Sequence, residues 1–244
     1  MANDPNRDIL MLIAKALGDI CEQFVFVGGC AAGLLVTSVR AQVIRPTDDV
    51  DIVAQVATTR EYHLLEKQLR AKGFTQDMNM GAPICRWSYQ GVAVDVMPTD
   101  EKILGFANRW YPLAIESAEQ FMLDEKTNIR LISAPAFIAT KLEAFEDRGK
   151  ADILLSHDME DIITVIDGRP SLLVEMNLAP RILQQYITEK FSVLLKHEEF
   201  LSVLPAYLPG DSASQARLPI LERKLHELAN LVVASKSGST KFGV

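Results

Sequence analysis

The sequence lacks paired cysteines, long apolar runs and an excess of basic residues. Its three cysteines, Cys21, Cys30 and Cys85, are too few and too scattered for a disulfide framework or a CxxC zinc site. We therefore expect buried thiols in a reducing compartment. No apolar run approaches the ~18–20 residues of a membrane-spanning helix, and the acidic start MANDPNRDIL lacks the basic region of an export signal. These absences predict a soluble cytoplasmic protein without a membrane partner.

Positive charge is also scarce. Lys and Arg total 25 against 32 Asp and Glu, which gives a net charge of −7. Such a chain lacks the broad positive field of a non-specific nucleic-acid-binding protein. Of its 244 residues, 48% are hydrophobic and 23% are charged, so a disordered chain is excluded and a core of useful size is expected.

Strand-like and helix-like segments separate along the chain, and no internal repeat is present. Apolar runs predict strands at 24–27, 50–54, 84–89 and 92–97, the last two joined by a Gln90-Gly91 turn, and periodicity predicts helices at 7–22, 30–39, 58–71, 133–149, 156–168, 178–190, 191–204 and 218–234. This order indicates an α/β (α+β) fold with a mixed sheet, followed by helices. We expect an α/β domain at 1–132, a helical domain at 133–234 and a flexible tail at 235–244.

Three aspartates carry the chemical information. Asp49 and Asp51 are two residues apart in a predicted strand, so both side chains lie on one face, about 6.5–7 Å apart along the strand. Asp95 is the lone acid of the apolar segment VAVDVM. Grouped carboxylates repel each other unless a cation lies between them, and a buried carboxylate needs a partner. Hard oxygen ligands at this spacing suit Mg²⁺.

A glycine pair, Gly28-Gly29, ends the first predicted strand and precedes a helix. A turn without Cβ atoms at a helix N-terminus exposes backbone N–H groups that bind anions. Taken singly, the glycines, the paired acids and the lone acid each have an ordinary structural explanation. Their joint occurrence in this order indicates a two-metal site for phosphoryl or nucleotidyl transfer.

These motifs resemble the DNA polymerase β-type nucleotidyltransferase superfamily over residues 24–97. Within it, Arg45-Pro46-Thr47 before the paired acids, followed by Lys141 and then an acid-bearing helix with Asp158 or Asp161, resembles the AbiEii/MenT-type toxins as far as about residue 168. The sequence departs from the pattern in two places. Nineteen residues separate Gly29 from Asp49, and Cys30 stands where many members have Ser. No further motif of CCA-adding enzymes is present.

The resemblance implies a polymerase β-like mixed sheet and a mechanism. Asp49 and Asp51 would hold two Mg²⁺ ions on the triphosphate of an NTP, and Asp95 would complete one metal site and help to deprotonate the attacking hydroxyl. The backbone at the glycine turn and nearby cations would hold the phosphates. The nucleotide-binding residues implied are Gly28, Gly29, Cys30, Arg45, Lys141, Arg148 and Asp161.

Three functions stay open. The first is transfer of a nucleoside monophosphate to an RNA 3′ end, such as that of tRNA, or to a protein side chain, with a possible antitoxin partner. The second is transfer to a small hydroxylated molecule, as in antibiotic nucleotidyltransferases, which the acidic pI favours; a basic groove of Arg60, Arg70 or Arg86 would favour RNA. The third is a non-catalytic module that senses a nucleotide or binds a partner, against which the three retained acids argue.

Overall fold

A mixed seven-stranded sheet forms the first half of the chain in the computed structural model, which describes residues 4–38, 44–56, 58–148 and 153–231. The strand order is β3-β4-β5-β2-β1-β7-β6. The central strand β2 runs parallel to β5 and antiparallel to β1, which in turn runs parallel to β7. The strands are β1 (Phe24–Val27), β2 (Asp49–Ala54), β3 (Thr75–Gln76), β4 (Arg86–Tyr89), β5 (Val92–Pro98), β6 (Glu119–Met122) and β7 (Asn128–Leu131).

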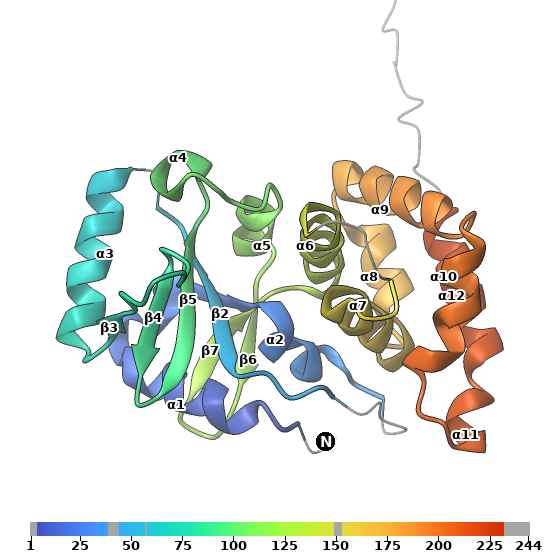
Figure 1. Cartoon of the computed structure of the whole chain (residues 1–244), viewed down its shortest axis with the longest axis horizontal. Helices are drawn as coiled ribbons and strands as arrows, with labels where there is room; N and C mark the ends of the chain where they lie inside the picture. Colours follow the sequence, from blue (N-terminus) through green and yellow to red (C-terminus); the bar gives the residue numbers. More distant parts are fainter. Residues whose placement is uncertain (1–3, 39–43, 57, 149–152, 232–244) are drawn as a thin grey trace, which may run out of the picture.

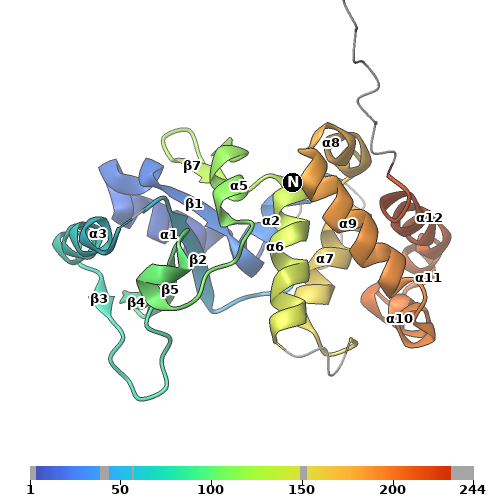
Figure 2. The ribbon, with the colours of Figure 1, turned by 90° about the horizontal axis from the view of Figure 1, so that it is seen from above.

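Helices flank the sheet and then form the second half of the chain (Figure 1), and the view from above shows the same separation (Figure 2). Helix α3 lies at the β3–β4 end of the sheet, and α2 lies between the sheet and the later helices. The helices are α1 (Arg7–Leu17), η1 (Gly18–Gln23), α2 (Gly28–Leu35), α3 (Thr59–Ala71), α4 (Glu101–Leu104), α5 (Tyr111–Glu116), α6 (Ala134–Asp147), α7 (His157–Gly168), α8 (Leu172–Leu178), α9 (Arg181–Leu194), α10 (Glu198–Val203), η2 (Leu204–Tyr207), α11 (Ser212–Gln215) and α12 (Leu218–Leu228).

The α/β class predicted from the sequence is confirmed. The differences concern element boundaries and short elements that the sequence did not predict, which include β3, α4, α5, α8 and α11. The first helix changes to a 3-10 helix at Gly18, whose φ of 57° is left-handed and ends an α-helix. Helix α2 begins at Gly28 rather than at Cys30. One helix, α9, crosses the predicted boundary at 190/191, and β6 and β7 form a hairpin that the sequence did not predict. The predicted helix ends at 39, 149 and 234 and the tail at 235–244 lie outside the described residues.

The sheet and the later helices share one continuous set of buried apolar side chains. Backbone contacts also join them, because the N–H groups of Thr37 and Ser38, just after α2, donate to the carbonyl of Gly168 at the end of α7. Arg169 donates to the carbonyl of Leu35 at 3.0 Å. These contacts fix α7 against α2 and so place residues of α7 beside the glycine turn. The domain boundary at residue 132 stays a prediction.

No helix among the described residues is both long and apolar enough to cross a membrane.

Candidate active site

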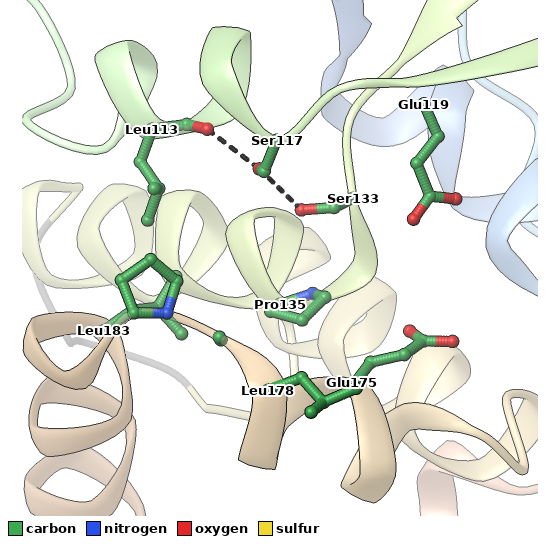
Figure 3. A pocket seen from close by; sticks show the side chains of 10 residues that line it. Leu113, Ser117, Glu119, Ser133, Pro135, Glu175, Leu178 and Leu183 are labelled. Carbon is green, nitrogen blue, oxygen red and sulfur yellow. Dashed lines mark hydrogen bonds between the residues drawn. The ribbon is translucent and has the colours of Figure 1, made fainter.

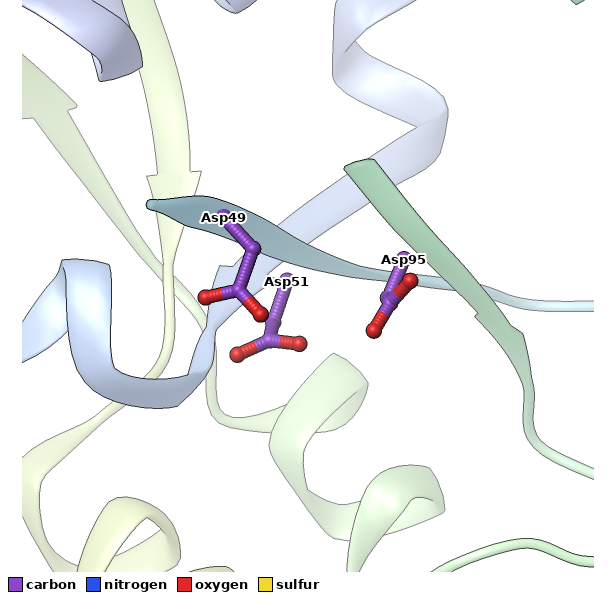
Figure 4. Close-up of side chains that lie close together, drawn as sticks. All are labelled: Asp49, Asp51 and Asp95. Atoms are coloured by element: carbon purple, nitrogen blue, oxygen red, sulfur yellow. The ribbon is translucent and has the colours of Figure 1, made fainter. Parts of the chain in front are cut away.

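The three predicted aspartates meet on one face of the sheet (Figure 4). Alternation along β2 places Asp49 and Asp51 on the same side, and the parallel register pairs Asp51 with Asp95 on β5. One carboxylate oxygen from each residue lies within 4.8 Å of the others. Asp95 is buried and the other two are partly exposed, so the cluster is open to solvent on one side.

The cluster is short of positive charge. Burial, together with the charges of Asp49 and Asp95, raises the pKa of Asp51 to about 7, against the opposing effect of Lys141 and Arg148. Asp51 is therefore only partly ionised near neutral pH unless another cation joins the three carboxylates. This is the electrostatic condition under which a divalent metal binds.

Arg86 supplies the positive charge in contact with the cluster among the described residues. Its Nε donates to one oxygen of Asp95 at 2.8 Å and its Nη2 to the other at 2.7 Å. The same Nη2 lies 3.4 Å from Oδ2 of Asp49. We call Arg86 and the three aspartates the sheet cluster. Two of the three carboxylates are thus already arranged around a cation. This arrangement and the hard oxygen donors of the carboxylates fit an ion such as Mg²⁺.

Gly28 makes room for Asp51 at the start of α2. Its φ is 65°, and a Cβ atom there would lie 1.7 Å from Oδ2 of Asp51. Any other residue would therefore clash with the carboxylate as well as strain the backbone. Helix α2 has no side-chain cap at Val27, so the first N–H groups of this helix are not occupied by a capping side chain. The glycine turn thus places uncapped helix donors directly beside an acid of the cluster.

A buried asparagine that the sequence analysis missed holds the segment before β2. The side chain of Asn6 is 1% exposed; its Nδ2 donates to the carbonyl of Arg45 at 3.0 Å and its Oδ1 accepts from the N–H of Thr47 at 2.9 Å. The Thr47 hydroxyl donates to Oδ1 of Asp49 at 2.7 Å. Asn6 therefore fixes the Arg45-Pro46-Thr47 segment, and through Thr47 it orients Asp49.

A second group of charges lies between α6 and α7. The Nζ atom of Lys141 lies 2.7 Å from Asp161 and 3.0 Å from Asp158, and all three side chains are buried. Arg148 contacts Asp158 at 3.2 Å, and Arg45 contacts Asp161 at 3.4 Å. We call these five residues the helix cluster. Burial alone would lower the pKa of Lys141, but Asp161 and Asp158 outweigh it and raise the pKa, so Lys141 stays charged.

The helix cluster reaches the glycine turn and the sheet cluster. A Cβ atom on Gly29 would lie 2.9 Å from Nη2 of Arg45 and 3.3 Å from Oδ2 of Asp161, so the absence of a side chain lets both approach the turn. A cleft then opens from the turn between α5 and α6. It is lined by Val27, Gly28, Asp51, Met97, Asn108, Tyr111, Thr140, Lys141, Ala144, Arg148 and Asp158.

The structure thus places the sequence-predicted residues around one cleft and its rim, with two refinements. The choice between Asp158 and Asp161 is unnecessary, because both contact Lys141. The Cys30 side chain points into the core, where its Sγ contacts the carbonyl of Val27 at 3.2 Å and burial raises the pKa of the thiol. Only its backbone N–H remains a candidate for phosphate binding.

A separate pocket of about 260 Å³ lies away from the acids, between α5, α6, α8 and α9 (Figure 3). Leucine, proline and alanine side chains form most of its wall. Its two serines are satisfied within the protein: Ser117 donates to the carbonyl of Leu113 at 2.8 Å and shares a 2.8 Å hydrogen bond with Ser133. Glu175 is paired with Arg169. No group at this pocket is arranged for chemistry comparable to that of the aspartates.

Comparison with known proteins agrees with this geometry at the level of the fold. No protein-family model and no curated protein matches the chain. Among solved structures, an antigenic nucleotidyltransferase-like protein from Paracoccidioides brasiliensis matches with a TM-score of 0.52 and 21% identity, over 84% of this chain and 94% of that one. A protein from H. pylori provisionally described as a nucleotidyltransferase matches at 0.42 and 13%, over 95% and 93%. The chain has a nucleotidyltransferase-like fold.

Proposed function

We propose that the chain is a Mg²⁺-dependent nucleotidyltransferase that moves a nucleoside monophosphate from an NTP to an acceptor hydroxyl, with release of pyrophosphate. The observation that carries this proposal is the convergence of Asp49, Asp51 and Asp95 on one face of the sheet, beside the uncapped start of α2. The nucleotidyltransferase-like fold supports it.

The residues have distinct parts in the proposed reaction. Asp49 and Asp51 would hold two metal ions, and Asp95 would contribute to one of the sites. Bound there, the ions would neutralise the triphosphate and activate the attacking oxygen. The first N–H groups of α2, from Gly28 to Cys30, would donate to phosphate oxygens.

Cations of the helix cluster lie where the phosphates would enter. Lys141 and Arg148 line the cleft with Asp51, and Arg45 lies over Gly29. Arg148 contacts Asp158, yet its side chain is 74% exposed and can also reach an anion in the cleft. The buried acids Asp158 and Asp161 would act indirectly, by holding Lys141 charged and in place.

The acceptor is the less determined half of the reaction. A protein side chain or an RNA 3′ end is the acceptor that the resemblance to AbiEii/MenT-type toxins suggests. In the metal-free protein two arginines of the expected basic groove are already paired: Arg86 binds Asp95 within the sheet cluster, and Arg70 contacts Glu66 and lies over the ring of Trp87. This observation favours a second candidate, a small hydroxylated acceptor, over RNA.

The test is a titration of the four NTPs, with and without Mg²⁺, on the wild type, Asp49→Asn and Asp48→Asn. Asp48 is the exposed neighbour of Asp49, so its substitution makes the same change in charge outside the cluster. We expect Mg²⁺-dependent binding of at least one NTP in the wild type and Asp48→Asn and its loss in Asp49→Asn, with transfer of labelled nucleotide reduced by roughly 10³-fold or more. Full transfer by a folded Asp49→Asn variant contradicts the proposal. Absence of NTP binding to the wild type supports a non-catalytic partner-binding module instead.

A further inference from the structure

Arg86 contacts two of the carboxylates that bind the metal in the proposed function. We propose that Arg86 is a resident cation of the sheet cluster: it positions Asp95 and Asp49 in the metal-free protein and gives them up when a divalent ion binds. This inference rests on the proposed function, because both concern the same carboxylates.

Strand register puts Arg86 in this position. The Gln90-Gly91 turn joins β4 to β5, both of its residues have positive φ, and the resulting antiparallel register places Arg86 directly opposite Asp95. Residues opposite one another in a sheet project from the same face, so the guanidinium extends over the carboxylates. The contact is therefore fixed by the backbone rather than by a mobile loop.

The guanidinium engages both oxygens of Asp95, at 2.8 and 2.7 Å, in the planar two-bond geometry that makes arginine–carboxylate pairs strong. Its third contact, at 3.4 Å, is to Asp49. A carboxylate held in this way is a weaker metal ligand, because one lone pair of each oxygen is occupied and the guanidinium repels a second cation. Binding of a divalent ion through Asp95 thus has to displace or weaken the Arg86 contact.

Competition between Arg86 and the metal predicts the direction in which metal affinity changes when Arg86 is removed, and a purely structural role predicts a different one. If Arg86 competes with the metal, its removal increases the affinity for the metal while destabilising the metal-free protein, in which three carboxylates then face each other. If Arg86 only braces the strands, its removal leaves the affinity unchanged or lowers it.

The experiment compares Arg86→Gln with the wild type and with Arg70→Gln. Arg70, on the exposed side of α3, undergoes the same loss of charge while it contacts Glu66 and Gln76 instead of the aspartates. Mn²⁺ is titrated in the absence of nucleotide, and electron paramagnetic resonance measures the concentration of free Mn²⁺. We expect Arg86→Gln to bind Mn²⁺ about tenfold more tightly, in keeping with a charge-assisted two-bond contact of ~1.4 kcal/mol or more. Its Tm falls in EDTA and recovers with Mn²⁺, and Arg70→Gln binds Mn²⁺ like the wild type.

Arg86→Lys provides a second variant, because it keeps the charge but loses the planar fork, and we expect Mn²⁺ affinity severalfold above that of the wild type. Wild-type-like or weaker Mn²⁺ binding by both variants overturns the inference and leaves the proposed function standing. Absence of Mn²⁺ binding by the wild type and by Arg86→Gln alike overturns the metal site, and with it both proposals.

Discussion

The sheet cluster and the helix cluster are built from the same kinds of residue, yet they balance charge in opposite ways. In the sheet cluster three carboxylates share the guanidinium of Arg86, and burial and repulsion raise the pKa of Asp51 to about 7. In the helix cluster two buried carboxylates contact three cations, one of which, Arg45, also pairs with Glu160, and the pKa of Lys141 is raised, so that it stays charged.

The comparison indicates a division of work between the two halves of the chain. A site with a deficit of positive charge attracts a metal ion, whereas a site whose cations are balanced but partly exposed, as Arg148 is, can still attract phosphate. The two lie side by side, because Asp51 and Lys141 line the same cleft. A metal–nucleotide complex carries both charges and matches both sites, which a metal ion or a phosphate alone does not.

The largest effect on stability is expected from breaking the helix cluster at its centre. Lys141→Met keeps the length of the side chain but leaves Asp158 and Asp161 buried with fewer partners. Such a change costs about 3 kcal/mol of the free energy of unfolding, because Asp158 then keeps only Arg148 as a partner and Asp161 keeps only Arg45. Urea denaturation measures it.

Lys190→Met is the matched control, because Lys190 pairs with the partly exposed Glu146 outside the helix cluster. Partly exposed pairs contribute about 1 kcal/mol or less. Equal losses in the two variants would mean that the helix cluster is no more than an ordinary set of surface ion pairs, and the comparison with the sheet cluster would fail.

A smaller effect on stability is expected from removing the Asn6 side chain, which holds the segment between the two clusters. Asn6→Ala leaves the Thr47 N–H and the Arg45 carbonyl without the Asn6 side chain, which costs about 1–3 kcal/mol because buried polar groups lose their partners. Metal binding weakens as well, since Thr47 then holds Asp49 less firmly.

Asn177→Ala serves as the control for that change, because the amide of Asn177 donates to the carbonyl of Leu173 on an exposed turn of α8. We expect its stability to change by about 0.5 kcal/mol or less. If both asparagine variants bind Mn²⁺ with wild-type affinity, Asn6 is a structural brace without influence on the metal site.

Much of the sheet cluster follows from local sequence patterns. Alternation along 49–54 places two acids on one face, and the lone acid of VAVDVM marks the neighbouring strand. The turn at Gln90-Gly91 also predicts the position of Arg86: a two-residue hairpin fixes the register, so Arg86 lies opposite Asp95. Arg86 was considered only as part of a basic groove for RNA.

The rest depends on contacts that no local pattern encodes. Asn6 precedes Thr47 by 41 residues, and its position before α1 gives no sign of a tertiary contact. The sequence leaves the choice between Asp158 and Asp161 open, because the first turn of any helix favours acids whether or not they have a tertiary partner. The β6–β7 hairpin was missed because its strands are short and β6 is largely exposed, which leaves little apolar alternation.

The pH dependence of metal binding tests the charge deficit of the sheet cluster most directly. Its expected effect is smaller than the effects of the Lys141 and Asn6 substitutions. Asp51 has to lose its proton to bind a metal, so Mn²⁺ affinity rises with pH and levels off above about 7. Between pH 6 and pH 8 the increase for one group with a pKa near 7 is about tenfold.

The stability of the metal-free protein changes in the opposite direction. Because the folded pKa of Asp51 lies above the ordinary value of 3.8, the folded state binds more protons than the unfolded state between about pH 4 and pH 7, and stability falls as the pH rises through this window. Mn²⁺ cancels the fall by supplying the missing positive charge, and Asp51→Asn abolishes it. Thermal unfolding at pH 6 and pH 8, in EDTA and in Mn²⁺, separates the two effects. Equal affinity at both pH values together with a flat stability profile would show that Asp51 is already ionised, so that Arg86 and the helix cluster suffice to balance the three carboxylates and the contrast between the clusters disappears.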